Sequence, residues 1–143
     1  MIPTPDHSSF PSGHAAEAFA LATVMHRLMT GDAATEGLQV WAMPFRLAHR
    51  IAVNRTVAGL HFPVDSAAGA IVGCAIGDAV CDVLDGAALK VRSFDGSKPF
   101  DDFTAAWLQQ KSAPDPAGGA VAAPALARAH WLKARLEWGS PSP

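Results

Sequence analysis

Glycine recurs every four residues in the apolar stretch Pro63–Leu84 of this chain. Residues four apart lie on one face of a helix, so Gly69, Gly73 and Gly77 would form a face without side chains. Such a face lets the backbone of a second helix approach closely. A proline opens the stretch and a glycine follows its end, which are start and stop signals of a helix. We therefore predict a long helix here, with another helix packed against it.

Helical signals account for most of the remaining chain, and no segment alternates polar and apolar residues as a half-buried strand does. The sequence therefore predicts an all-α fold, a bundle of about five helices. Pro44 is expected to start a new turn in the second helix or to kink it. The predicted helices span about 13–29, 35–57, 63–84, 97–111 and 124–138.

The chain has 143 residues, a length typical of one domain with a substantial core. We predict a helical core over residues 1–111, a linker over 112–123, and a C-terminal helix with a disordered tail over 124–143. Half of the residues are hydrophobic and 17% are charged, a composition that disfavours disorder for most of the chain. The net charge of −2 argues against a nucleic-acid partner.

The cysteine spacing argues against a disulfide and a zinc site, and the N-terminus argues against a signal peptide. In a helix, Cys74 and Cys81 would share a face about 10 Å apart, too far for a disulfide, and are predicted to be buried free thiols. No zinc-ligand spacing is present, so we expect no metal site. The start of the chain lacks the regions of a signal peptide, and the run Ala67–Gly77 is shorter than a membrane span. We expect the chain as given to be soluble, with no transmembrane span, and its cellular location stays open.

A candidate anion site opens the first predicted helix, at Pro11-Ser12-Gly13-His14. Ser12 is a favoured N-cap residue, and the first backbone N–H groups of a helix have no partner within it. These groups and the helix dipole attract an anion, and Gly13 would let it approach the backbone closely. His14 on the first turn is able to give or take a proton. The alternative is an ordinary cap followed by a surface histidine.

A second motif has the spacing Arg55-x5-His61-x3-Asp65. A carboxylate four residues after a histidine can accept the ring N–H and so fix which nitrogen carries the proton. A histidine held in this way is prepared to attack phosphorus or to bind an oxyanion. The planar guanidinium of Arg55 matches a phosphate group. Taken alone, the motif also fits a helix-end salt bridge with a capping aspartate. Its combination with the upstream Pro-Ser-Gly-His favours an anion site.

Together these motifs resemble the second and third signature motifs of the type 2 phosphatidic acid phosphatase and vanadium haloperoxidase superfamily. The resemblance covers roughly residues 5–80 and implies an all-helical bundle that holds a phosphate or vanadate ion. It implies that His61 is the phosphorylated nucleophile, or the axial ligand of vanadate. His14 would be the general acid, and Asp65 would orient His61. The residues implied to bind the oxyanion are Arg55, Ser12 and Gly13.

The resemblance leaves three functions open. The first is acid-phosphatase-like phosphomonoester hydrolysis through a phosphohistidine at His61, with lipid phosphates among the candidate esters and no cofactor. The second is a haloperoxidase that holds vanadate in the same site, because vanadate and phosphate share a tetrahedral geometry. The third is a catalytically weak or inert helical fragment that acts through assembly. In the first two cases the partner is a small phosphate ester or an oxyanion, and no motif identifies the natural substrate.

One family signature has no counterpart in this sequence. The first motif, a lysine and an Arg-Pro pair, would precede Pro11, but residues 1–10 contain neither Lys nor Arg. We therefore expect the C-terminal half of a family member, an incomplete family domain. Such a half would leave apolar faces uncovered, among them Phe19, Leu21 and the glycine face, so we predict a homodimer. Basic residues elsewhere in the chain are candidates to replace the lysine and arginine of the missing motif. A solvated basic face is the more common role of such residues. The candidates are Arg46, Arg50, Lys90, Arg92 and Lys98.

Overall fold

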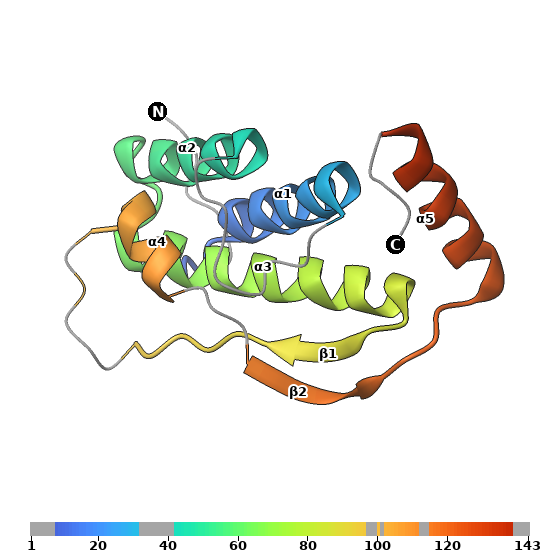
Figure 1. The fold of residues 1–143 in the computed structure, drawn as a ribbon. Helices are drawn as coiled ribbons and strands as arrows, with labels where there is room; N and C mark the ends of the chain where they lie inside the picture. The colour runs from blue at the N-terminus through green and yellow to red at the C-terminus, as the bar shows by residue number, and fades with distance from the viewer. Residues whose placement is uncertain (1–7, 32–41, 97–99, 101, 112–114, 139–143) are drawn as a thin grey trace.

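The computed structural model describes residues 8–31, 42–96, 100, 102–111 and 115–138 of the chain. In these residues the chain forms helices and one two-stranded sheet (Figure 1). The helices are α1 (Gly13–Thr30), α2 (Met43–Val57), α3 (Pro63–Asp85), α4 (Ala105–Lys111) and α5 (Ala125–Glu137). The predicted fold, a bundle of about five helices, is confirmed.

The two longest helices begin and end where the sequence signals predicted. Ser12 caps α1, because its Oγ accepts a hydrogen bond from the Ala15 backbone N–H at 3.4 Å. Gly31 ends α1 with φ 75°, and Gly86 ends α3 with φ 71°. Glycine adopts this left-handed conformation without a steric penalty, so both positions make efficient helix stops.

Two helices start later than the predicted boundaries. α2 begins at Met43 with Pro44 in its first turn, and most of the expected earlier part, 35–41, lies outside the described residues. α4 begins at Ala105, whereas the predicted helix began near residue 97. The prediction was wrong at residues 102–104, which are not helical, and residues 97–99 and 101 lie outside the described residues. The physical reason is a cap nearer to the helix: Thr104 Oγ1 accepts from the Trp107 backbone N–H at 3.1 Å.

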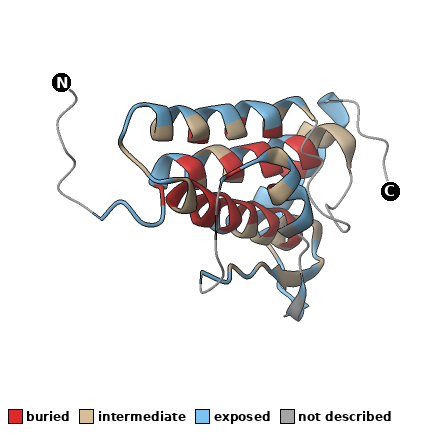
Figure 2. Ribbon diagram, turned by 90° about the vertical axis from the view of Figure 1, so that its left-hand side faces the viewer, coloured by how far each residue is buried: buried red, intermediate tan, exposed pale blue. Residues whose placement is uncertain are grey.

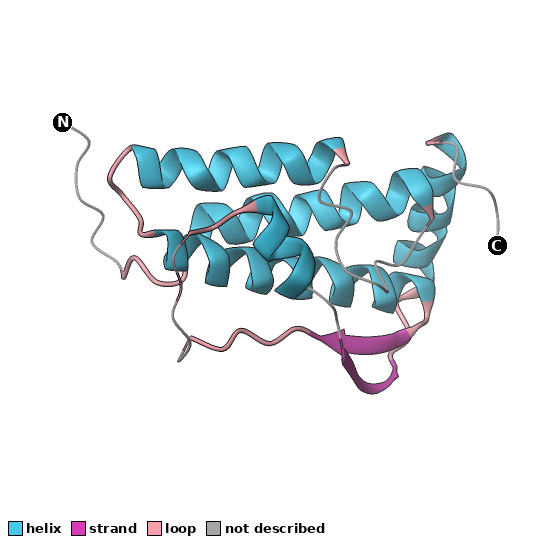
Figure 3. Ribbon diagram, turned by 60° about the vertical axis from the view of Figure 1, so that its left-hand side comes forward, coloured by secondary structure: helices cyan, strands magenta, loops and turns pink. Residues whose placement is uncertain are grey.

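A short antiparallel sheet links the segment after α3 to the segment before α5 (Figure 3). β1 (Ala88–Val91) pairs with β2 (Asp115–Ala120). The sequence predicted no strand, so this sheet corrects that expectation; residues 115–120 fall within the predicted linker over 112–123. β1 is too short to show a clear alternation, and β2 contains proline and glycine, which are depleted in strands. Pairing between segments distant in sequence, rather than local propensity, creates these strands.

The glycine face of α3 packs against α1, as the sequence predicted. A Cβ at Gly73 would overlap the backbone of Ala16, and one at Gly77 would lie 2.6 Å from the Cβ of Thr23. These contacts advance in the same direction along both helices, so α1 and α3 lie side by side and parallel (Figure 2). The packing corrects one expectation, because the glycine face and the fully buried Phe19 are covered within the chain and are not open to a second copy.

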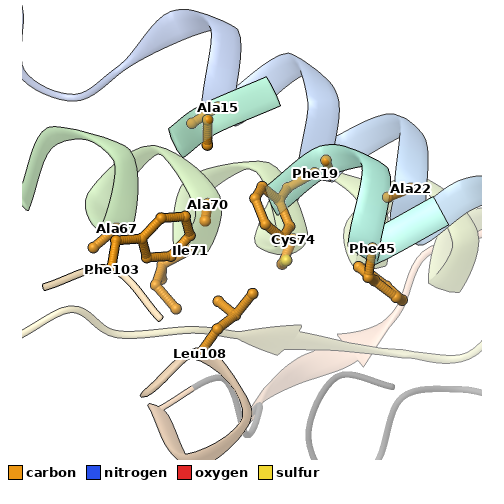
Figure 4. Packing of buried hydrophobic residues seen from close by; sticks show 12 residues of the cluster. Ala15, Phe19, Ala22, Phe45, Ala67, Ala70, Ile71, Cys74, Phe103 and Leu108 are labelled. Carbon is orange, nitrogen blue, oxygen red and sulfur yellow. The ribbon is translucent and has the colours of Figure 1, made fainter. Parts of the chain in front are cut away.

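The core lies between α1, α2, α3 and α4 and is built from aromatic and small apolar side chains (Figure 4). The ring of Phe19 lies 6.4 Å from that of Phe45 and 6.1 Å from that of Phe103, measured between centroids. Such aromatic pairs add to the stabilisation from burial alone. The core therefore joins the two long helices to α2 and to the loop that leads into α4.

Cys74 and Cys81 are buried free thiols, as predicted. Both belong to α3, and burial is the main influence on their ionisation. It raises the pKa of each thiol to about 12. Because thiolate is the reactive form, both cysteines stay neutral and unreactive at pH 7 and contribute to packing.

A cluster of buried charged side chains lies at the C-terminal end of α3. Asp82 is fully buried and accepts hydrogen bonds from Arg27 Nη2 at 3.2 Å and Lys90 Nζ at 3.1 Å. Asp85 accepts from Arg27 Nε at 2.9 Å and from the Trp131 indole N–H at 2.7 Å. The cluster therefore ties α1, the strand β1 and the C-terminal helix α5 to one end of α3.

By length and composition, α3 could cross a membrane, and no other described helix passes that test. Its most apolar window has a mean hydropathy of 1.7, and 61% of that window is buried within the fold. The core helix of a soluble protein has the same properties, because it is also apolar on most sides. The expectation of no transmembrane span therefore stays a prediction.

Candidate active site

The two sequence motifs meet because α1 and α3 begin side by side. The Ser12 backbone N–H donates to the Asp65 carbonyl oxygen at 2.9 Å, which joins the residue before α1 to the first turn of α3. The Ser12 side chain is fully buried, and its Oγ is engaged in capping α1. The structure therefore gives Ser12 a positioning role, while its contact with an oxyanion stays a prediction.

Arg55 approaches the same end of the bundle from the last turn of α2. The Ser66 hydroxyl donates to the Ala52 carbonyl oxygen at 3.4 Å, so the end of α2 lies against the start of α3. The Leu60 N–H donates to the Arg55 carbonyl oxygen at 3.0 Å, and Gly59, with φ 71°, turns the chain between the helices. Arg55 Nε is buried and has no hydrogen-bond partner among the described residues. An unpaired buried donor is costly, so this N–H is suited to bind an anion.

His61 lies just before α3 and contacts Asp65, as the motif predicted. His61 Nδ1 is 3.4 Å from Asp65 Oδ2, and only 7% and 4% of the two side chains are exposed. The same oxygen accepts from the Phe62 backbone N–H at 3.0 Å, so Asp65 also caps α3. The predicted contact with His61 and a cap of α3 are therefore both present, while the catalytic role of Asp65 stays a prediction. A proton on Nδ1 leaves Nε2 with a lone pair for a substrate.

Gly13 and His14 are exposed on the first turn of α1. A Cβ at Gly13 would meet nothing within 4 Å, so the space beside this backbone is open. Open space next to the N–H groups that begin a helix is what an approaching anion requires. The structure thus brings Arg55, His61 and Asp65 to the end of the bundle where α1 also starts.

Comparison with known proteins identifies the family to which these motifs belong. The PAP2 superfamily matches residues 2–85 of the chain. The matched segment includes both motifs and all of α1, α2 and α3, and it amounts to more than half of the chain. The chain belongs to the PAP2 superfamily.

Curated relatives of this PAP2 chain include a phosphatase known from two strains of Mycobacterium tuberculosis. In both it is named decaprenylphosphoryl-5-phosphoribose phosphatase, and it is 33% identical to this chain over 91 residues. The alignment covers 64% of this chain and 45% of each relative, so the chain spans about half the length of the curated relatives it matches. No solved structure matches the chain.

Two basic residues considered as substitutes for the first PAP2 motif lie far from this site. Lys90 pairs with Asp82, and Arg92 Nε donates to Asp78 Oδ2 at 2.7 Å. Asp78 lies roughly 20 Å along the axis of α3 from Asp65, at about 1.5 Å per residue. The suggestion that Lys90 or Arg92 reaches the anion site within one chain is therefore wrong. Lys90 and Arg92 are instead paired with the buried carboxylates of Asp82 and Asp78.

The structure shows no contact between the other basic candidates and the residues of the candidate site. Arg46 and Arg50 are exposed on α2, and Lys98 lies outside the described residues. Within the described ranges, no three side chains of His, Cys, Asp or Glu gather as they would to hold a metal ion. Among the basic residues that the structure describes, Arg55 is the one with a buried, unpartnered donor in the last turn of α2.

Proposed function

We propose that this PAP2 chain hydrolyses phosphomonoesters, with His61 as the nucleophile and without a cofactor. The family and the phosphatase relatives support phosphomonoester hydrolysis as the class of reaction. The observation that carries the proposal is the contact between His61 Nδ1 and the buried Asp65 at the joined starts of α1 and α3. That contact orients Nε2 for attack, and Arg55 Nε offers an unpaired donor for the phosphoryl group.

In the proposed reaction, His61 Nε2 attacks phosphorus and the bond from phosphorus to the ester oxygen breaks. His14 gives its proton to that oxygen, which leaves as an alcohol. In the second step, water attacks phosphorus, His14 takes a proton from the water, and the P–N bond breaks. Inorganic phosphate and the original His61 result. Arg55 and the N–H groups of α1, beside Gly13, would stabilise charge on the phosphoryl oxygens, and Asp65 would stabilise the charged His61 ring.

Vanadate binding tests the role of Arg55 because vanadate copies the geometry of phosphate. Arg55→Ala should weaken vanadate binding about ten- to a hundredfold, the equivalent of one hydrogen bond between charged groups. Isothermal titration calorimetry gives both affinities. Arg50→Ala is the matched control, since Arg50 lies on the same helix and is exposed. Equal affinities of wild type and Arg55→Ala would remove Arg55 from the site.

Two alternative functions differ from the phosphatase: one uses the same site residues, and the other uses none of them. A vanadium-dependent haloperoxidase would hold vanadate with His61 and Arg55, and the bound vanadate would activate hydrogen peroxide, the oxidant, for the oxidation of halide. An inert assembly fragment would have no turnover. Hydrolysis of p-nitrophenyl phosphate supports the phosphatase, vanadate-dependent bromination of a dye supports the haloperoxidase, and the absence of both supports the inert fragment. The name of the relatives includes a prenyl lipid phosphate, which keeps lipid phosphates among the candidate esters.

We also propose that the chain forms a homodimer. Large apolar side chains are exposed on the α1–α3 pair, in place of the glycine face first expected to be open. On α3 they recur every four residues and form one stripe. A contiguous exposed apolar surface favours association, and light scattering at micromolar concentration should give twice the mass of one chain. A monomeric mass would contradict the proposal. The exposed side chains are Leu21, Met25, Val72, Ile76 and Val80.

A further inference from the structure

The first turn of α3 carries a buried serine whose hydroxyl bonds to another helix. Ser66 follows Asp65 and is fully buried, and its Oγ donates to the Ala52 carbonyl oxygen of α2 at 3.4 Å. A hydroxyl inside a helix more often bonds a carbonyl oxygen of its own helix one turn back, as Thr23 of α1 does with Phe19 at 2.8 Å. Ser66 instead uses its hydroxyl proton in a contact between two helices.

This contact lies one turn before Arg55. Ala52 and Arg55 are three residues apart in α2, so they lie about 4.5 Å apart along the helix axis and are neighbours on its surface. α2 packs mainly against α1 and makes little contact with α3. Within the described residues, no other side-chain hydrogen bond joins α2 to α3. The Ser66 hydroxyl is therefore the polar link between the end of α2 and the start of α3.

Several parts of the candidate site are tied to the same turn of α3. The Asp65 carboxylate contacts His61, and the Asp65 carbonyl oxygen accepts from the Ser12 N–H just before α1. Ser66 adds a bond to α2, the helix that carries Arg55. Two consecutive residues thus connect the proposed nucleophile, the start of α1 and the helix of the proposed anion-binding arginine.

We infer that Ser66 is a positioning residue that sets the place of Arg55 relative to His61. The inference rests on the proposed function, because that function assigns Arg55 and His61 to one phosphoryl group. A guanidinium stabilises an anion only when its N–H groups lie within hydrogen-bond distance of the oxygens, and a misplacement of about 1 Å is enough to weaken binding and catalysis. Without the Ser66 hydroxyl, the end of α2 would lose its polar link to α3.

Vanadate affinity in a double-mutant cycle tests this inference. Ser66→Ala should weaken vanadate binding about three- to tenfold, because it removes the link and leaves every proposed anion ligand in place. In a protein that already carries Arg55→Ala, the same substitution should change the affinity by less than about twofold, since no guanidinium is left to position. Alanine is a strong helix former, so α3 should persist. Isothermal titration calorimetry gives the affinities, and urea unfolding gives the stability of each variant.

The matched control is Thr23→Val, which removes another buried hydroxyl and keeps the size of the side chain. Thr23 lies against Gly77, roughly 18 Å along α3 from Asp65. Its substitution should therefore leave the vanadate affinity within about twofold of the wild type. A loss in Thr23→Val equal to that in Ser66→Ala would show an effect of stability alone and overturn the inference.

Other results would also overturn it. These are an unchanged affinity in Ser66→Ala, the same loss in Ser66→Ala with and without Arg55, and the absence of vanadate binding to the wild type. Hydrolysis of p-nitrophenyl phosphate is measured separately. Coupling between Ser66 and Arg55 in a protein without hydrolysis would refute the proposed reaction and keep the positioning role. Hydrolysis without that coupling would refute only the role of Ser66.

Discussion

Replacement of His61 by alanine should abolish the hydrolysis of p-nitrophenyl phosphate, with a loss of about a thousandfold or more. The proposed mechanism gives the reaction one nucleophile, and alanine has no group that can form the bond to phosphorus. Single-turnover kinetics and capture of the phosphorylated protein provide the measurements. Wild-type protein should carry an acid-labile phosphoryl group that His61→Ala lacks. Undiminished hydrolysis by His61→Ala would rule out the phosphohistidine.

Asp65→Asn serves as the companion variant because it changes the partner of His61 while keeping its size. An amide in place of the carboxylate can still accept the Phe62 N–H, so the cap of α3 should survive. Vanadate affinity should change little, whereas the turnover rate should fall about a hundredfold or more, because His61 no longer has its anionic partner. A loss of folding or of vanadate affinity without a separate effect on rate would indicate a purely structural role for Asp65.

Asp82→Ala should lower the free energy of unfolding by about 3–5 kcal/mol, a large share of the roughly 5–15 kcal/mol of a typical domain. Asp82 is fully buried and accepts from Arg27 and Lys90, and the Arg27 side chain is itself only 7% exposed. Alanine would leave these cations with fewer acceptors in a region that water does not reach freely. Urea unfolding followed by circular dichroism measures the change.

Glu137→Ala provides the control for this charge effect. Glu137 pairs with Lys133 at 3.8 Å on α5, but the two side chains are 60% and 74% exposed. Solvent screens such a pair, so its loss should change the free energy of unfolding by less than about 0.5 kcal/mol. If Asp82→Ala were as mild as Glu137→Ala, the buried charge cluster would not be a major source of stability.

Local patterns in the sequence determined the helices that carry the site. The cap at Ser12 and the glycine stops at Gly31 and Gly86 act within one or two turns, so they predicted the bounds of α1 and α3 closely. The glycines of α3 predicted a close helix–helix contact, because spacing alone places them on one face. Asp65 was correctly paired with His61 for the same reason: residues four apart at a helix start are neighbours.

Contacts between segments distant in the sequence could not be predicted from local patterns. The Ser12 N–H bond to the Asp65 carbonyl, which joins the two motifs, depends on how α1 and α3 pack. The same is true of β1 and β2, which are strands because they pair with each other, and of Lys90, which is bound to Asp82 instead of the anion site. Sequence spacing fixes neighbours along one helix, whereas partners across helices are selected by the burial and charge balance of the whole fold. The sequence by itself therefore determined the candidate site residues and the local contact between His61 and Asp65, and the tertiary structure decided which of the candidates lie at the same end of the bundle.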